Sequence, residues 1–226
     1  MSDGVWAVIP VKPLRGALRR LRPALDARVR RELQVAMLTD VLTACAGARR
    51  LEGVLVVTSD PDAAALAGAI ARARVVPDHD PPRGMNAAVA RGLTAVAAEG
   101  AGAALVMTAD LPLLHPDDID ALVAAAPPEP SVTIAPSHEG TGTNAMLLRP
   151  PRALAPRLGP DSFARHTAQA ARRGLPLVRV DLRRVALDID TPRDVAALIA
   201  AGGGGATVDV CGALDVADLL EAGSAL

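Results

Sequence analysis

The chain has 226 residues, half of them hydrophobic and 22% charged, which suits one globular domain and excludes an intrinsically disordered chain. The formal net charge of -1 argues against a nucleic-acid partner held by phosphate neutralisation. Two distant cysteines, Cys45 and Cys211, exclude a disulfide framework and a zinc site of the usual spacing. With neither a signal-peptide pattern nor an apolar run of about 20 residues, we expect a soluble cytoplasmic protein without a membrane partner.

Strands and helices are predicted to alternate along most of the chain. Short apolar runs predict strands at 5–9, 54–57, 75–76, 103–107, 132–134, 145–148 and 177–180. Periodicity and capping residues predict helices after Asp26, at 62–71, 86–98, 116–126 and 161–173, and from Pro192. This alternation predicts an α/β fold, with a Rossmann-like, mixed but mainly parallel sheet covered by helices on both faces. Ligands of such sheets bind at the carboxyl ends of the strands.

The end of the chain is predicted to stand apart from this sheet. Gly202 to Gly205 indicate a flexible hinge. We therefore expect a domain at residues 1–201 and a C-terminal appendage at residues 202–226, whose purpose the sequence does not show.

The segment after the first predicted strand is strongly basic. Residues 12–31 hold eight cations and one acid, and Lys12 is the only lysine in the chain. A cleft of one sign concentrates ligands of the other sign, so we expect an anionic ligand near residues 12–22. The arginines at positions 28, 30 and 31 are better explained as a solvated helix face.

Three acids lie at the ends of predicted extended segments. Asp110 follows the strand at 103–107, and Asp188 and Asp190 point to one face while Ile189 points inward. Carboxylates in this arrangement are suited to a magnesium ion that carries phosphates. The alternatives are a turn-stabilising role for Asp110 and a helix-capping role for Asp190, which would leave Asp188 unexplained.

Glycines beside hydroxyl residues indicate anion binding in two further segments. The runs at 140–144 and 159–163 allow amides and hydroxyls to converge, and the second run opens a predicted helix. Gly84 and Asn86 could support a base or a ribose. The alternatives are turns and ordinary helix starts. The four histidines are scattered and have no paired nucleophile, so structural or surface roles are expected for them.

Five of these segments, in this order, match the motifs of a known family: 10–14, 109–113, 142–145, 159–163 and 187–192. They resemble the 2-phospho-L-lactate guanylyltransferase family, which includes the phosphoenolpyruvate guanylyltransferases of coenzyme F-420 biosynthesis. The resemblance spans residues 5 to 200. It implies the nucleotidyltransferase fold of the glycosyltransferase-A type.

The resemblance also implies a role for each residue of the site. The implied roles are catalytic cations (Lys12, Arg20), acid binding (Thr143, Gly159, Ser162), nucleotide binding (Gly84, Asn86) and Mg²⁺ binding (Asp110, Asp188, Asp190). The chain departs from the family where Ala-Lys-Ser-Arg-Leu is usual, because Leu18 and Arg19 replace the lysine and the serine. The departure bears on the acceptor more than on the reaction type.

The resemblance implies a guanylyltransferase whose partners are GTP and a small phosphorylated acid: 2-phospho-L-lactate, phosphoenolpyruvate or 3-phosphoglycerate. A phosphate monoester is mostly dianionic at neutral pH, so its attack on the α-phosphorus of GTP needs no side-chain base. Pyrophosphate would leave. The alternatives are a molybdenum-cofactor-type nucleotidyltransferase, which usually has a glycine-rich loop after its first strand, and a nucleotide-binding module without turnover. The sequence leaves open whether the chain forms a homodimer.

Overall fold

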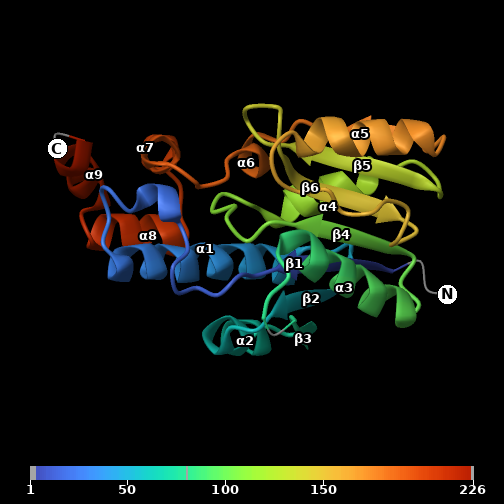
Figure 1. Ribbon diagram of the computed structural model, residues 1–226, viewed down its shortest axis with the longest axis horizontal. Coiled ribbons are helices and arrows are strands. Elements are labelled where there is room, and N and C mark those ends of the chain that lie inside the picture. The colour runs from blue at the N-terminus through green and yellow to red at the C-terminus, as the bar shows by residue number, and fades with distance from the viewer. Residues whose placement is uncertain (1–3, 80, 225–226) are drawn as a thin grey trace.

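The structure is a computed structural model that describes residues 4–79 and 81–224 (Figure 1). In this part of the chain seven strands form one sheet in the order β3-β2-β1-β4-β6-β5-β7. The strands are β1 (Val5–Pro10), β2 (Leu51–Thr58), β3 (Ala73–Pro77), β4 (Ala103–Met107), β5 (Ser131–Pro136), β6 (Thr143–Arg149) and β7 (Leu177–Arg179).

The sheet is mixed but mainly parallel. Strand β6 runs antiparallel to both of its neighbours, β4 and β5, whereas the other pairs of neighbouring strands are parallel. The predicted fold class is therefore confirmed. Because β6 runs the opposite way, its first residue lies at the same edge of the sheet as the last residues of β4.

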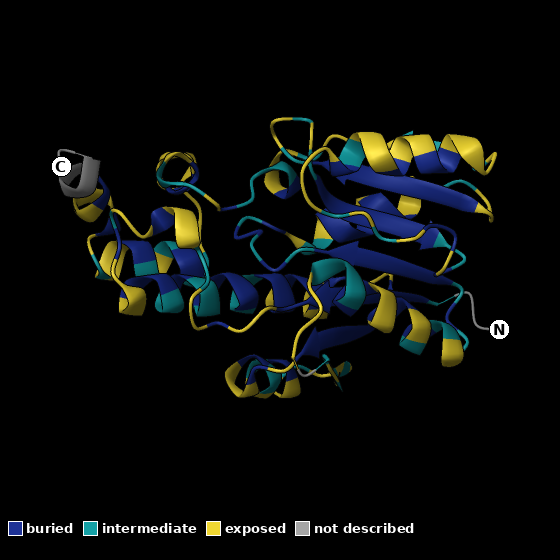
Figure 2. Ribbon diagram, viewed as in Figure 1, coloured by how far each residue is buried: buried dark blue, intermediate teal, exposed yellow. Residues whose placement is uncertain are grey.

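Helices cover both faces of the sheet, and their buried sides form two apolar layers (Figure 2). One face is covered by α1 (Ala27–Gly47), α2 (Pro61–Gly68), α4 (Pro116–Ala124) and α6 (Arg183–Ala186). The other face is covered by α3 (Met85–Ala98) and α5 (Ser162–Arg172). Gly92 lets α3 lie close to the sheet, because a Cβ there would stand 2.5 Å from the Val8 side chain.

The capping residues expected from the sequence begin several of these helices. Asp26 accepts a hydrogen bond from the Val29 amide at 2.8 Å and starts α1, as predicted. Before residue 192, two short elements were missed. Helix α6 and the 3-10 helix η1 (Arg19–Leu21) each have fewer than five residues, too few to show a helical period.

The C-terminal segment packs on the outer half of α1 through α7 (Pro192–Ala201), α8 (Ala206–Ala213) and α9 (Val216–Ser224). From α1, Asp40 accepts hydrogen bonds from the Ala206 and Thr207 amides at 2.7 and 2.9 Å and so caps α8. A third apolar cluster joins these helices to Leu21 and Leu25 of the N-terminal loop. The division of the chain at residue 202 stays a prediction.

Of the described helices, none is by itself long and apolar enough to cross a membrane, and only α7 and α8 taken together, bent by 106°, meet the length and composition test.

Candidate active site

The basic loop begins where β1 ends, and two backbone hydrogen bonds fix it there. The Val11 amide donates to Val57 O at 2.9 Å, and the Leu14 amide donates to the buried Asp60 carboxylate at 2.8 Å. Lys12 lies between these two anchored residues and is exposed. Its backbone is therefore held at the carboxyl end of β1 while its ammonium group stays in solvent.

The three predicted acids meet at the same edge of the sheet, and we call Asp110, Asp188 and Asp190 the acidic cluster. Asp110 follows β4, the neighbour of β1. The Ile189 amide donates to Asp110 O at 3.1 Å, which ties the second segment to the first. Ile189 is 2% exposed and packs into the third apolar cluster, so its inward orientation follows the prediction.

The electrostatics of the acidic cluster call for a cation. Burial raises the pKa of Asp110 to about 6, and the negative charges of Asp188 and Asp190 act in the same direction. Burial also raises the pKa of Asp188. Among the described residues, nothing forms a hydrogen bond to the buried atoms Asp110 Oδ1 and Thr108 Oγ1. Buried carboxylate and hydroxyl oxygens without partners, beside further carboxylates, fit a hard divalent cation such as Mg²⁺.

Asp190 does not cap α7, so that alternative is excluded. Thr191 is the N-cap, and the Asp194 carboxylate accepts from the Thr191 and Asp190 amides at 2.7 and 3.1 Å. The Asp190 side chain instead forms an exposed ion pair with Arg20 at 3.1 Å. Within residues 4–79 and 81–224, no three acid, histidine or cysteine side chains already enclose a metal position. The metal-binding role of the cluster stays a prediction.

A β-bulge separates the side chains of Thr143 and Asn144. Ala135 pairs with Ala145, but Pro136 pairs with Thr143, so Asn144 is an extra residue in β6. Asn144 turns toward α6, where its amide donates to Val185 O at 2.9 Å and to Asp188 Oδ1 at 3.0 Å. Asn144 thus orients a carboxylate of the acidic cluster, a role that we did not predict although the residue belongs to a quoted motif.

The bulge turns Thr143 to the opposite face, toward α5. There its Oγ1 lies 3.1 Å from Nδ1 of His166, which is fully buried. Ser162, 2% exposed, opens α5, and its amide donates to Gly159 O at 3.1 Å. Gly159 has a φ of +113°, which favours glycine. We call Thr143, Gly159 and Ser162 the hydroxyl cluster; their contact with an acid stays a prediction.

The predicted nucleotide residues lie where α3 begins. Gly84 precedes the helix with a φ of +93°. The Asn86 side chain is engaged by the protein, since it accepts from the Leu158 amide at 2.7 Å and donates to Leu158 O at 3.1 Å. Asn86 therefore anchors the loop that carries Gly159. A direct contact of Gly84 or Asn86 with a nucleotide stays a prediction.

Leu18 packs against the third apolar cluster. It has a φ of +50° and is half-buried there. The apolar side chain at this position is thus explained by packing, because the neighbouring surface is built by residues such as Val216 and Leu220.

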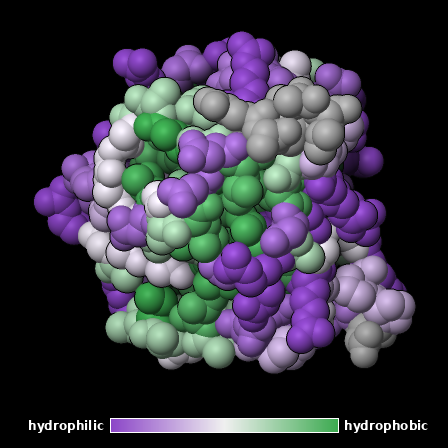
Figure 3. All heavy atoms as spheres, turned by 90° about the vertical axis from the view of Figure 1, so that its left-hand side faces the viewer, coloured by the Kyte–Doolittle hydropathy of each residue, from purple (hydrophilic) through white to green (hydrophobic). Residues whose placement is uncertain are grey.

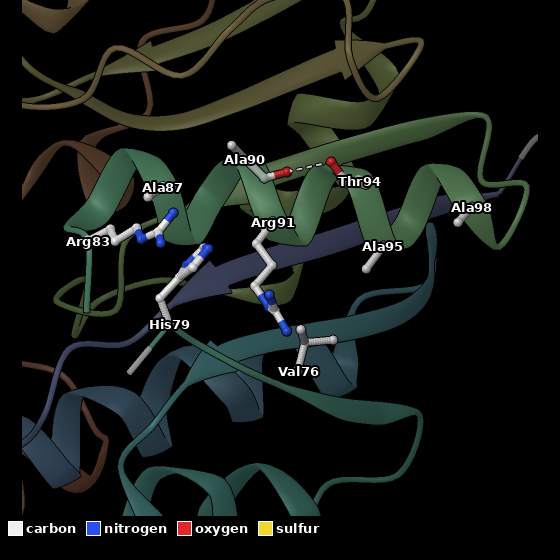
Figure 4. A pocket seen from close by; sticks show the side chains of 9 residues that line it. All are labelled: Val76, His79, Arg83, Ala87, Ala90, Arg91, Thr94, Ala95 and Ala98. Carbon is white, nitrogen blue, oxygen red and sulfur yellow. Dashed lines mark hydrogen bonds between the residues drawn. The ribbon is translucent and has the colours of Figure 1, made fainter. Parts of the chain in front are cut away.

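Two surface hollows are lined by other residues than those of the acidic and hydroxyl clusters. One, of about 600 Å³, runs along the outer side of α3 next to β3 and is lined by alanines together with His79, Arg83 and Arg91 (Figure 4). The other, of about 880 Å³, lies between α1, residues 112–116 and residues 201–205. Figure 3 looks at the end of the molecule where the C-terminal helices lie and shows apolar surface surrounded by polar residues.

Comparisons with known proteins agree with the fold. The family described as guanylyl transferase CofC-like matches residues 5–225. A phosphoenolpyruvate guanylyltransferase of Sphaerobacter thermophilus is 42% identical over 91% of this chain and 98% of its own. One of Rubrobacter xylanophilus is 43% identical over 88% and 95%. A crystal structure from Desulfovibrio desulfuricans G20, assigned as a nucleotide-diphospho-sugar transferase, superposes with a TM-score of 0.76 at 15% identity, covering 98% of both chains.

Proposed function

The chain belongs to the guanylyl transferase CofC-like family, and on this premise we propose that it transfers GMP from GTP to phosphoenolpyruvate and releases pyrophosphate. The proposal places the chain in coenzyme F-420 biosynthesis. One observation carries it: three carboxylates, one of them with a buried oxygen that has no partner among the described residues, meet at the edge of the sheet where β4 ends, and one of them pairs with Arg20. The full-length similarity to two phosphoenolpyruvate guanylyltransferases supports the choice of acid.

The chain has to position two polyanions and offset their charge. Asp110, Asp188 and Asp190 would hold Mg²⁺, which when bound stabilises the charge of the attacking and leaving phosphate oxygens. Lys12, which is exposed, would contact the phosphates as a mobile point charge. Arg20 is 71% exposed and joined to Asp190 by a single contact, so it can turn from the carboxylate to a phosphate at little cost.

The acid would bind at the hydroxyl cluster. Thr143 and Ser162 offer hydroxyl donors, and the backbone of Gly159 is open to close approach because nothing lies within 4 Å of a Cβ position there. These groups would hold the carboxylate of phosphoenolpyruvate. The phosphate of the acid is its own nucleophile, since with a second pKa near about 6 it is mostly dianionic at neutral pH.

Pyrophosphate release tests the proposal. GTP, Mg²⁺ and the purified chain are combined with phosphoenolpyruvate, 2-phospho-L-lactate or 3-phosphoglycerate in turn, and ATP and CTP replace GTP in parallel reactions. We expect the fastest release with GTP and phosphoenolpyruvate, and none without an acid. Faster release with another acid would correct the acceptor. No release with any pair would refute the reaction.

A further inference from the structure

We propose that buried His166 is a positioning residue for acid recognition, because it fixes the Thr143 hydroxyl as a hydrogen-bond donor toward the acid. This inference rests on the proposed function. His166 follows Ser162 by four residues on α5, so both side chains lie on the same face of the helix. On this face of α5, Ser162 can contact the acid, and His166 lies one helical turn further along the helix.

The two ring nitrogens of His166 have different partners, and this difference fixes the tautomer. Nε2 lies 2.9 Å from the backbone amide of Arg157. An amide N–H can only donate, so Nε2 is the acceptor, and the proton of the neutral ring is on Nδ1. Burial, together with the charges of Arg165 and Arg157, lowers the pKa of His166 to about 4, so the ring is neutral at neutral pH.

The tautomer decides what the Thr143 hydroxyl can do. Because Nδ1 carries the proton, it donates to Thr143 Oγ1 across 3.1 Å. The hydroxyl accepts that bond, and its own single proton is left for another acceptor. A carboxylate accepts and cannot donate, so a hydroxyl held in this way is matched to an anionic ligand. With the opposite tautomer the Thr143 hydroxyl would donate its proton to Nδ1 and could not donate to the acid.

The position of His166 is itself fixed by a row of side chains along α5. His166 bonds Arg157 N, and Gln169, in the amide orientation that satisfies both groups, bonds Ala155 N and O at 3.1 and 3.0 Å. Arg173, just past the helix end, donates to Ala153 O at 2.7 Å. Alternate residues of the 153–157 segment are thus held against one helix, and His166 is the member of the row nearest to Gly159.

Two substitutions separate orientation of Thr143 from support of the loop. In His166→Asn the amide nitrogen can stand near the place of Nδ1 and donate to Thr143. In His166→Gln the amide oxygen can reach the place of Nε2 and accept from Arg157, while the donor to Thr143 is lost. We expect the KM for phosphoenolpyruvate to rise about tenfold in His166→Gln and less than about threefold in His166→Asn. In both variants the KM for GTP should stay within about twofold.

A double-mutant cycle with Thr143→Val tests whether His166 acts through Thr143. In the Thr143→Val background, His166→Gln should change the KM for phosphoenolpyruvate by less than about twofold. His138→Gln makes the same change on an exposed ring and is the matched control. Equal effects of His166→Asn and His166→Gln, or a full effect of His166→Gln without the Thr143 hydroxyl, would overturn the proposal.

The tautomer is measured without any ligand, which separates this inference from the proposed function. The ¹⁵N shifts of the histidine rings are recorded at pH 7, and the His166 signals are identified by their loss in His166→Gln. We expect a neutral ring protonated on Nδ1. A ring protonated on Nε2 would refute the inference even if the chain turns over phosphoenolpyruvate. Failure of turnover with every acid, by contrast, would refute the function and leave the tautomer as measured.

Discussion

The acidic cluster and the hydroxyl cluster differ in how far the protein alone completes them. Thr143 and His166 bond each other, and the loop before Gly159 is held from both sides by His166 and Asn86. In the acidic cluster, Asp110 Oδ1 has no partner among the described residues, and like charges stand near one another. A buried charge without compensation is unstable, whereas a bonded hydroxyl is not. One cluster thus needs positive charge from a ligand, whereas the other is already held in place by the protein and is matched to an anionic ligand.

The largest effect is expected where the acidic cluster is weakened. Asp110→Asn keeps the shape of the side chain but removes a charge that would bind the metal. We expect turnover to fall by about two orders of magnitude or more, and Asp188→Asn to act in the same way. Stability without metal at pH 7 should not fall in Asp110→Asn, because one oxygen of the buried carboxylate has no partner among the described residues and burial disfavours the charge.

The measurements for this prediction are pyrophosphate release and the urea midpoint. Asp181→Asn removes an exposed carboxylate that pairs with Arg179 nearby, so it serves as the control. A folded Asp110→Asn variant with near-normal turnover would contradict the metal assignment.

The second prediction concerns the hydroxyl cluster and the way in which His166 makes the stability of the protein depend on pH. In the unfolded chain His166 titrates near its ordinary pKa of 6.5, but in the folded protein near 4. Between these values the unfolded state binds more protons, so the free energy of unfolding falls as the pH is lowered. The loss should be about 2 to 3 kcal/mol between pH 6.5 and pH 4. Over this range the wild type should lose about that much more stability to urea than His166→Gln, and an equal loss in both would contradict the buried neutral ring.

The third prediction concerns the hydroxyls themselves. Loss of one hydrogen bond to a charged group costs about 1.5–3 kcal/mol, so Thr143→Val and Ser162→Ala should raise the KM for the acid about ten- to a hundredfold. The KM for GTP should stay nearly unchanged. Thr133→Val is the matched control, because the Thr133 hydroxyl is buried and has no partner among the described residues. An equal loss of GTP affinity would place these residues with the nucleotide.

The smallest effect is expected when Lys12 keeps its charge but changes its shape. Lys12→Arg keeps the charge but replaces a compact ammonium with a planar fork that approaches phosphate differently. We expect a loss of about tenfold in kcat/KM, and a larger loss for Lys12→Met. Steady-state kinetics with varied GTP measures both. Full activity of Lys12→Arg would show that the lone lysine is not needed as such.

The sequence was sufficient to predict the layers of the fold and the edge at which the site forms. Asp110 follows β4, and the carboxyl ends of parallel strands meet at one edge, so its place follows from the fold class. Asp188 follows α6 instead of a strand, so its approach to Asp110 does not follow from that rule. The alternation of Asp188, Ile189 and Asp190 likewise predicted which of the three points inward. The periodicity of side chains along a strand is a local property of the sequence, and the meeting of strand ends is a general property of the fold class.

The contacts behind the site could not be predicted in the same way. Thr143 and His166 are 23 residues apart, and they meet only because a bulge turns Thr143 away from the face shared by Ala145. Strict alternation would have placed Thr143 and Asn144 on the wrong faces. The spacing of Ser162 and His166 by one helical turn was a usable signal for His166. The partner of Asp188, Asn144, had no such local signal.

The packing of the C-terminal helices has a consequence for synthesis of the chain. Leu21 and Leu25, which flank the basic loop, belong to the same buried cluster as Cys211, Val216 and Leu220. A ribosome makes these last residues long after the strands that form the sheet. While residues 206–220 are still inside the ribosome, the sheet can form, but the loop that carries Arg20 lacks the apolar residues against which it packs. Because Ile189 packs into the same cluster, the segment that carries Asp188 and Asp190 lacks that support as well, and the site becomes complete only after residues 206–220 have left the ribosome.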